Sequence, residues 1–105
     1  MRGHLHTLVQ LSSLRYMDAH QSGANDYSVV TRPAQNNNTQ QWQLTMVAGV
    51  YMIQQLSTDQ FIDAHEHAGA DYSVVTRPSQ YNDTQRWVVS GLGRNLFTID
   101  RKSVV

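Results

Sequence analysis

The sequence predicts an all-β domain built from a duplicated unit of four strands. The eight letters DYSVVTRP occur twice, at residues 26–33 and 71–78, which places the two occurrences 45 residues apart. The same shift aligns residues 16–42 with residues 61–87 without a gap, and 16 of these 27 positions are identical. The apolar runs are short, and none has the period of a helix. Repeated units of this kind bury their apolar faces only against neighbours of their own kind.

Each unit is expected to contain four short strands separated by turn-forming residues. The strands are expected at residues 4–10, 15–19, 26–32 and 41–46, and again at residues 49–55, 60–64, 71–77 and 86–90. Pro33 and Pro78 have no N–H to give to a strand ladder, so the third strand of each unit should end at Arg32 and Arg77. Loops rich in serine, glycine and asparagine lie between the strands.

A single domain over residues 1–105 is expected, because a chain of this length builds one core. We expect a first repeat over residues 4–46, a second over residues 49–91 and the start of a third over residues 95–105. Three full repeats would need about 135 residues, so the predicted assembly has open strand edges. A second copy of the chain that covers these edges would explain them, as would truncation of a three-repeat protein.

Composition narrows the class of partner. Eight basic and eight acidic residues give a net charge of zero, and neither sign forms a run. This is not the charge pattern of a nucleic-acid or acidic-membrane binder, so a neutral partner is expected. There is no cysteine, which excludes disulfides and thiolate metal sites. No cofactor is expected.

The N-terminal segment does not resemble an export signal. The stretch MRGHLHTLVQLSSL carries two histidines and several polar residues where a signal peptide would be apolar, and no later segment is long enough to span a membrane. We therefore expect no membrane insertion, and a protein that is either cytoplasmic or secreted by a non-classical route. The compartment stays open.

Residues that recur at the same point of both repeats are candidates for the core or for a site. Trp42 and Trp87 each open an apolar run, which favours a core position. Gln40 and Gln85 precede them by two residues and can tie the preceding polar loop to the backbone. Because side chains alternate along a strand, Tyr27 is expected on the same face as Val29, toward the core.

The combination of a Gln-x-Trp sequence at the end of each unit and an aspartate in its second strand resembles the ricin B-type lectin family. The residues concerned are Gln40-Gln41-Trp42 with Asp18, and Gln85-Arg86-Trp87 with Asp63. The resemblance covers nearly the whole chain. It implies a β-trefoil-like fold, here with two complete four-stranded repeats and the start of a third, that is, an incomplete trefoil. It also implies a non-catalytic module that binds glycans, such as those on glycoproteins or glycolipids.

The resemblance also implies which residues contact the sugar. In the family, the second-strand aspartate accepts hydrogen bonds from sugar hydroxyls, an aromatic ring of the third strand stacks on the sugar, and an Asn or Gln near the Gln-x-Trp sequence completes the site. The outward positions of the third strand here hold Val30 and Arg32, so Tyr27 and Tyr72 are the substitute rings. The candidate carbohydrate-binding residues are Asp18, His20, Tyr27, Asn37 and Gln40, and in the second repeat Asp63, His65, Tyr72, Asn82 and Gln85.

Several of these residues have an equally simple structural interpretation. The two histidines either donate to a sugar oxygen or anchor a loop, and the two asparagines serve either a turn or the ligand. Asp26 and Asp71 are expected to bond the backbone of their own loop. Arg32 and Arg77 either pair with a carboxylate or reach into the sugar groove. The lectin role itself requires Asp18 and Asp63 to have equivalent surroundings and to reach solvent.

Enzymatic and metal-binding functions are not favoured. The sequence Asp63-Ala64-His65-Glu66-His67 lacks the ligand set of a dedicated zinc site, and its Glu and second His are absent from the first repeat. Every aspartate of the candidate sites belongs to a repeat, whereas a hydrolase needs two groups that converge on one cleft. The alternatives to a lectin are a protein-interaction or inhibitor module on the same scaffold, and an accessory fragment of a larger toxin or hydrolase.

Overall fold

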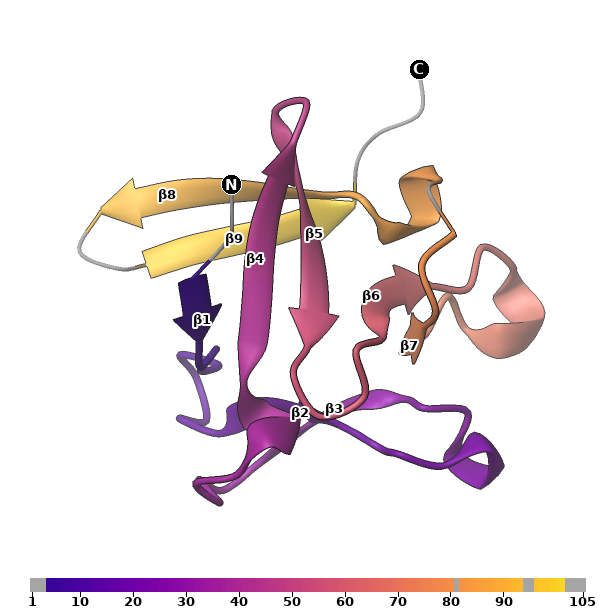
Figure 1. The fold of residues 1–105 in the computed structure, drawn as a ribbon, viewed down its shortest axis with the longest axis horizontal. Helices are drawn as coiled ribbons and strands as arrows, with labels where there is room; N and C mark the ends of the chain where they lie inside the picture. Colours follow the sequence, from indigo (N-terminus) through magenta and orange to yellow (C-terminus); the bar gives the residue numbers. More distant parts are fainter. Residues whose placement is uncertain (1–3, 81, 94–95, 102–105) are drawn as a thin grey trace.

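The computed structural model describes residues 4–80, 82–93 and 96–101, and in this part of the chain it is all-β (Figure 1). The strands are β1 (His4–His6), β2 (Tyr16–Ala19), β3 (Val29–Arg32), β4 (Trp42–Val47), β5 (Val50–Gln55), β6 (Phe61–Ala64), β7 (Val74–Arg77), β8 (Trp87–Gly93) and β9 (Leu96–Arg101). Four single turns of 3-10 helix lie between them, namely η1 (Gly23–Asn25), η2 (Asn38–Gln40), η3 (Ala68–Ala70) and η4 (Asp83–Gln85). The order β2-η1-β3-η2-β4 recurs as β6-η3-β7-η4-β8, which is the duplication seen in the sequence.

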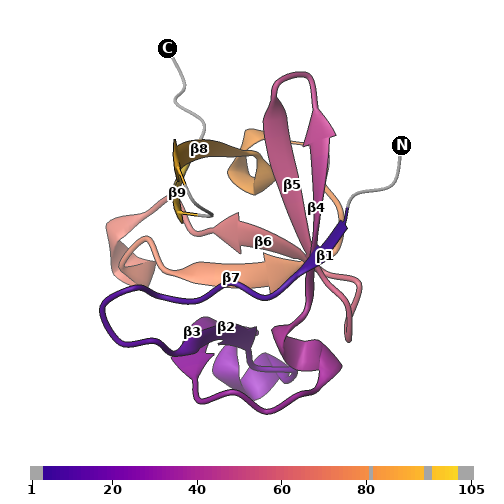
Figure 2. The same cartoon turned by 90° about the vertical axis from the view of Figure 1, so that its left-hand side faces the viewer.

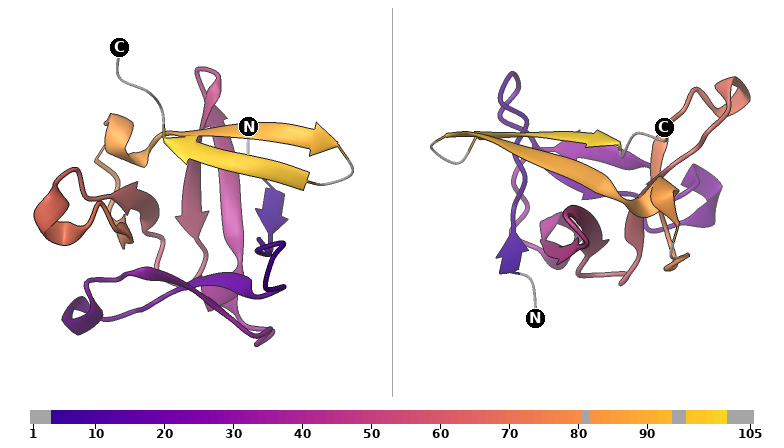
Figure 3. Two further views of the ribbon diagram at one scale, coloured as in Figure 1. Left: turned by 180° about the vertical axis from the view of Figure 1, so that it is seen from behind. Right: turned by 90° about the horizontal axis from the view of Figure 1, so that it is seen from above.

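The strands pair antiparallel in two sheets. The larger sheet runs β1-β4-β5-β6-β7, with β8 joined to β5 and β9 joined to β8, while β2 and β3 form a separate two-stranded ribbon (Figure 2). The β2–β3 ribbon and the β8–β9 hairpin lie at opposite ends of the β4–β5 hairpin (Figure 3). An isolated bridge between Ser28 and Val75 connects the ribbon to β7. The two repeats therefore touch through their third strands.

The two tryptophans lie in the core, as their place in the sequence predicted. Both indole rings are buried in a cluster with Ile53 and Ile62. The indole N–H of Trp42 donates to the carbonyl of Met17 at 3.0 Å, and that of Trp87 makes the equivalent bond to Ile62, also at 3.0 Å. Each tryptophan is the first residue of its strand, and its indole N–H ties that strand to the second strand of the same repeat. The buried indole N–H therefore has a hydrogen-bond partner in both repeats.

The third strand of each repeat starts later than the sequence pattern suggested. Asp26 and Tyr27 have φ angles of 55° and 50°, and Asp71 and Tyr72 have 55° and 48°, so both pairs are left-handed and stand outside the strand. Alternation of side chains begins only after them. The prediction that Tyr27 shares the core face with Val29 is therefore wrong, and Tyr72 is 56% exposed.

The other strand predictions agree with the structure apart from their ends. A strand overlaps each of the eight predicted segments, with β4 and β8 running past the predicted ends to Val47 and Gly93, and β3 and β7 end at Arg32 and Arg77, immediately before the prolines. The first strand is shorter than expected, because Val9 makes only an isolated bridge to Tyr16. Of the expected third repeat, β9 is present, and residues 95 and 102–105 lie outside the described residues. No helix in the described part of the chain is long or apolar enough to cross a membrane.

Candidate functional site

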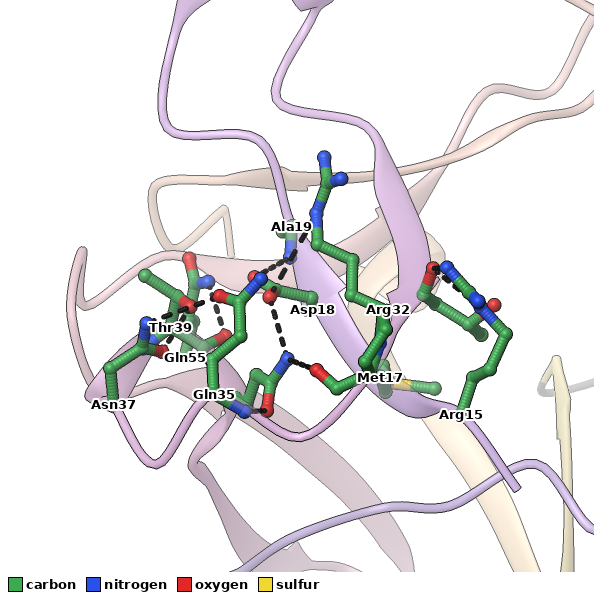
Figure 4. A network of polar contacts seen from close by, with 12 residues as sticks. Arg15, Met17, Asp18, Ala19, Arg32, Gln35, Asn37, Thr39 and Gln55 are labelled. Atoms are coloured by element: carbon green, nitrogen blue, oxygen red, sulfur yellow. Dashed lines mark hydrogen bonds and ion pairs between the residues drawn. The ribbon is translucent and has the colours of Figure 1, made fainter. Parts of the chain in front are cut away.

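The aspartate of the first repeat lies in a buried network with the glutamine of the Gln-x-Trp sequence (Figure 4). One oxygen of Asp18, on β2, accepts the N–H of Ala19 at 2.7 Å, and the other accepts the side-chain amide of Gln40 at 3.0 Å. The same amide donates to the carbonyl of Pro33 at 2.9 Å, and the Gln40 side-chain oxygen accepts the N–H of Gln35 at 3.0 Å. Gln40 therefore ties the loop after β3 to the carboxylate beneath it and has no free donor for a ligand.

The second repeat reproduces this network atom for atom. Asp63, on β6, accepts the N–H of Ala64 at 2.7 Å and the amide of Gln85 at 3.1 Å. Gln85 also donates to the carbonyl of Pro78 at 2.8 Å and accepts the N–H of Gln80 at 3.0 Å. The two aspartates thus have equivalent surroundings, one of the two conditions that the sequence analysis set.

The second condition, access to solvent, is not met in this conformation. Asp18 is 2% exposed and Asp63 is 5% exposed. The expectation that both carboxylates face solvent is therefore wrong, because the glutamine and its loop close over each of them. An ionised carboxylate has about four acceptor positions, and two are used here, so what each aspartate lacks is access rather than acceptor capacity.

The two asparagines serve the turns that precede the Gln-x-Trp sequences. The side-chain oxygen of Asn37 accepts the N–H of Thr39 at 3.2 Å and its hydroxyl at 2.6 Å, and so caps η2. Asn82 makes the same pair of contacts to Thr84, at 3.2 and 2.5 Å, and caps η4. Both side chains remain exposed. Their turn role is observed, and a ligand contact remains a proposal.

An aspartate of the first repeat bonds two basic side chains of the second. Asp26, which follows η1, places one carboxylate oxygen 2.7 Å from Nε2 of His65 and the other on Nη2 of Arg77. Nη1 of Arg77 also donates to the Asp26 carbonyl at 3.1 Å. The hydrogen bonds from His65 and then from Arg77 lower the pKa of the Asp26 carboxyl below its ordinary value of 3.8. The sequence analysis assigned Asp26 to its own loop, whereas its side chain bonds the other repeat.

Backbone contacts extend this interface. The N–H of Thr76 donates to the carbonyl of Tyr27 at 2.9 Å, beside the bridge between Ser28 and Val75. Val75 and Thr76 are consequently buried, whereas their counterparts Val30 and Thr31 in the identical sequence are only partly buried. The difference arises because the Tyr27–Ser28 backbone runs along the outer edge of β7, whereas within the described ranges the outer edge of β3 is met by the Arg15 side chain and by no backbone segment.

The corresponding groups of the first repeat are open. The side chain of His20 makes no hydrogen bond or ion pair with the described residues, and Nε of Arg32 lies 4.0 Å from Asp18. The Arg32 side chain is 38% exposed, compared with 25% for Arg77. Asp71, the counterpart of Asp26, has the same left-handed backbone, and its carboxylate has no partner among the described residues. The histidine and arginine of the second repeat are thus both engaged by Asp26, whereas in the first repeat Arg32 approaches only Asp18 and the His20 side chain has no partner among the described residues.

A small hollow of about 160 Å³ adjoins the network of the first repeat. Its lining includes the ring of Tyr16, the amides of Asn36 and Asn37, and Gln40. The sequence analysis overlooked Tyr16, although the residue precedes Asp18 by two positions on one strand and so lies on the same face of β2. That spacing was the available sign of an aromatic side chain next to the candidate site.

The histidine-rich segment of the second repeat forms a ring contact. The rings of His65 and His67 meet edge to face with their centroids 5.6 Å apart, and His65 is already engaged by Asp26. Throughout the described ranges, no group of three or more His, Cys, Asp or Glu side chains is placed to hold a metal ion.

Comparison with known proteins supports the fold. A crystal structure of the designed 3-fold symmetric protein ThreeFoil matches with a TM-score of 0.80 and 20% identity, over 92% of this chain and 71% of that one. The exo-β-1,3-galactanase 1,3Gal43A from Clostridium thermocellum matches with a TM-score of 0.76 and 22% identity, over 95% of this chain and 22% of that one. No curated protein sequence matches the chain.

The family follows from the sequence match. The model of the family described as ricin-type beta-trefoil lectin domain-like matches residues 1–76 and again residues 38–103. The two matches overlap and together extend over nearly all of the sequence. They agree with the all-β architecture and with the trefoil-like structural neighbours. The chain belongs to the ricin-type β-trefoil lectin domain-like family.

Proposed function

We propose that this domain binds carbohydrate without catalysing a reaction, and that the working site lies on the first repeat, over Asp18. The observation that carries this proposal is the open hollow beside the Asp18 network, which combines an aromatic ring with amide groups. Membership of a lectin-like family supports a binding role. The match to part of a galactanase also suits a module that accompanies an enzyme.

The chemistry of the hollow suits one sugar ring. The Tyr16 ring offers an apolar face for the C–H patch of a pyranose, and the amides of Asn36 and Asn37 offer donors and acceptors for its hydroxyls. The volume is small beside the roughly 300–1,000 Å³ of pockets that hold drug-sized ligands. A site this shallow should bind a monosaccharide with a dissociation constant on the order of micromolar to millimolar.

Asp18 contributes directly when Arg32 moves aside. The guanidinium approaches the carboxylate only to 4.0 Å and is substantially exposed, so little holds it in place. Exposed side chains change rotamer within picoseconds to nanoseconds, which is fast compared with ligand binding. Displacement of Arg32, together with movement of the loop that Gln40 holds over the carboxylate, would give sugar hydroxyl groups a route to the free acceptor positions of Asp18.

The second repeat is proposed to bind sugar only after it has opened. Arg77 and His65 of the second repeat are both held by the carboxylate of Asp26. A ligand would have to displace the contacts of Asp26 before reaching His65 or Arg77. Tyr72 is 56% exposed and takes no part in these contacts. The sugar-binding roles of His65 and Asn82 therefore depend on release of Asp26, and Gln85, like Gln40, has both amide donors engaged within the protein.

A glycan array probed with the wild type and with Asp18→Asn and Asp63→Asn tests the function. The two substitutions disturb equivalent buried networks, so each controls for the structural effect of the other. Signal that is lost in Asp18→Asn and kept in Asp63→Asn is the expected result, with thermal melting used to verify folding. Tyr16→Ser tests the same hollow without touching the buried carboxylate. A folded wild type that binds no glycan would contradict the proposal.

A protein-interaction or inhibitor function is the second candidate. Its support is the set of large apolar side chains that stand exposed on loops and turns, namely Leu11, Leu14 and Tyr72. This function predicts no signal on the array and one protein partner in a pull-down. Replacement of Leu11 and Leu14 by serine would abolish that capture.

A further inference from the structure

We propose that His20 and Arg32 of the first repeat recognise a carboxylate, so that the sugars bound there are acidic. This inference rests on the proposed carbohydrate-binding function and specifies its ligand class. It departs from the neutral partner that the net charge of zero suggested. Net charge does not reveal that strand alternation and register assign these two basic residues to one face of the β2–β3 ribbon.

The chain itself contains an example of the recognition. In the second repeat the equivalent pair, His65 and Arg77, holds the carboxylate of Asp26, with one nitrogen on each oxygen. Arg77 uses its second terminal nitrogen for the carbonyl of the same residue. Charge-assisted hydrogen bonds of this kind are stronger than neutral ones and select an ionised acceptor.

The backbone places the first-repeat pair in the same way. Arg32 stands opposite Tyr16 in the β2–β3 register, as Arg77 stands opposite Phe61 in the β6–β7 register. The N–H of His20 donates to the carbonyl of Ser28 at 2.9 Å, and the N–H of His65 makes the corresponding bond at 3.0 Å. The backbone that carries His20 and Arg32 is thus paired in the same way as the backbone that carries His65 and Arg77.

The first-repeat pair is also less neutralised than its counterpart. Among the described residues no carboxylate bonds the His20 side chain, and Asp18, 4.0 Å from Arg32, already accepts from Gln40. The residues after His20 are Gln21 and Ser22, where the second repeat has a glutamate and a histidine. The first repeat therefore presents positive charge without an acidic neighbour at these positions.

A second copy of the chain is a less suitable occupant than a small ligand. Its Asp71-Tyr72-Ser73 would match the internal Asp26-Tyr27-Ser28, and charge alone would permit the contact. The units of a three-fold symmetric protein are related by a threefold rotation. If the same rotation relates the two repeats here, an incoming chain whose Asp71 docked on His20 and Arg32 would place its own first repeat in the space of the recipient's second repeat. The two chains would overlap, whereas a monosaccharide would not.

Matched acidic and neutral sugars test the inference by calorimetric titration at low ionic strength. The pairs are methyl glucuronide with methyl glucoside, methyl galacturonide with methyl galactoside, and sialyllactose with lactose. We expect the acidic member of at least one pair to bind at least about tenfold more tightly, with an advantage that shrinks as salt is added. Arg32→Gln should remove that advantage, and Arg86→Gln, which removes an i,i+3 ion pair with Asp83 outside both proposed sites, should retain it.

The outcomes separate this inference from the function on which it rests. Neutral sugars that bind as tightly as acidic ones in every pair would overturn the inference and leave the lectin function standing. A folded protein that binds neither member of any pair would overturn both. Binding of the capped peptide Asp-Tyr-Ser in place of acidic sugars would overturn the inference in favour of peptide recognition. Self-association that Asp71→Asn abolishes would likewise overturn it in favour of a second chain.

Discussion

Asp26 and Asp71 are the same residue in two identical eight-residue segments, and they have different partners. Asp26 bridges His65 and Arg77, while the Asp71 side chain has no partner among the described residues. Both have the left-handed backbone that aspartate tolerates better than most residues. The difference comes only from what lies beside each loop, and so it cannot be read from either segment alone.

Asp26→Asn should reduce stability in a pH-dependent way. The pKa of Asp26 lies below its ordinary value of 3.8, so the folded protein binds this proton less readily than the unfolded chain does. The contacts of the ionised Asp26 carboxylate therefore stabilise the fold at pH values above its ordinary pKa of 3.8. This stabilisation is lost as the pH falls through the lowered pKa of the folded protein. Urea denaturation between about pH 2 and pH 6 should show a smaller acid-dependent loss in Asp26→Asn than in the wild type. Asp71→Asn should follow the wild type, and equal behaviour of the two variants would refute the assignment.

Gln85→Leu should destabilise the fold strongly. The side chain is fully buried and makes three hydrogen bonds, one of them to the carboxylate of Asp63. Its removal leaves a buried charge without its amide donor, which should cost about 2–4 kcal/mol of the free energy of unfolding in urea titrations. Gln54→Leu, which removes one exposed bond to Asp59, is the control and should cost less than about 1 kcal/mol. Similar losses in both variants would mean that the network is not the source of stability.

Several site features could be predicted residue by residue, and others could not. The core tryptophans and the loop-tying glutamines followed from their repeated position, because burial and amide pairing recur with the sequence. Burial of Asp18 and Asp63 could not be inferred, since it depends on how closely the loop folds over each strand. The contact between Asp26 and Arg77 spans 51 residues and depends on how the repeats pack.

The elements of the fold were largely predictable from alternation, prolines and turn residues. The exception is the start of the third strand, where two successive left-handed residues delay β3 and β7. Aromatic residues seldom adopt this conformation, so DYS reads as strand by propensity alone. The contacts of Tyr27 with the second repeat provide compensation that only the folded chain reveals.

The β4–β5 hairpin allows a direct test at the level of one turn. Its two-residue loop, Ala48-Gly49, has φ angles of 53° and 84°, the positive pair of a type I′ turn. Alanine is poorly suited to the first position, and asparagine is preferred there. Ala48→Asn should therefore raise the free energy of unfolding by about 0.5–1 kcal/mol in thermal or urea denaturation. Ala24→Asn, outside this turn, should not stabilise, and a loss of stability in Ala48→Asn would contradict the turn type.

Across the whole molecule, two repeats of similar sequence present different surfaces. The outer edge of β7 is covered by the backbone of the first repeat, whereas the outer edge of β3 is contacted by the Arg15 side chain, which donates to the Thr31 carbonyl at 3.4 Å. Met17 stands opposite Thr31 in the β2–β3 register, and its N–H donates to the carbonyl of Leu8 at 2.7 Å. Met17 and Thr31 are therefore a non-hydrogen-bonded pair of the antiparallel ladder, and the Thr31 N–H points away from β2. Ligand access should follow this asymmetry.

Hydrogen exchange should report the asymmetry without a ligand. The Thr76 N–H is bonded to Tyr27 and buried, so its exchange should be slower than that of Thr31 by at least about tenfold. Native-state exchange followed by NMR measures both amides in one sample. Comparable rates would show that the first-repeat edge is covered in solution, and would argue against an open site there.

An NMR titration of the isotope-labelled wild type, with a sugar that the glycan array selects, tests whether sugar binds at the first repeat rather than at the second. We expect chemical-shift changes at Tyr16, Thr31 and Arg32. Little change is expected at their counterparts in the second repeat, Phe61, Thr76 and Arg77. Changes confined to the second repeat, or equal in both repeats, would contradict the claim that Asp26 occupies His65 and Arg77 while His20 and Arg32 stay available to a ligand.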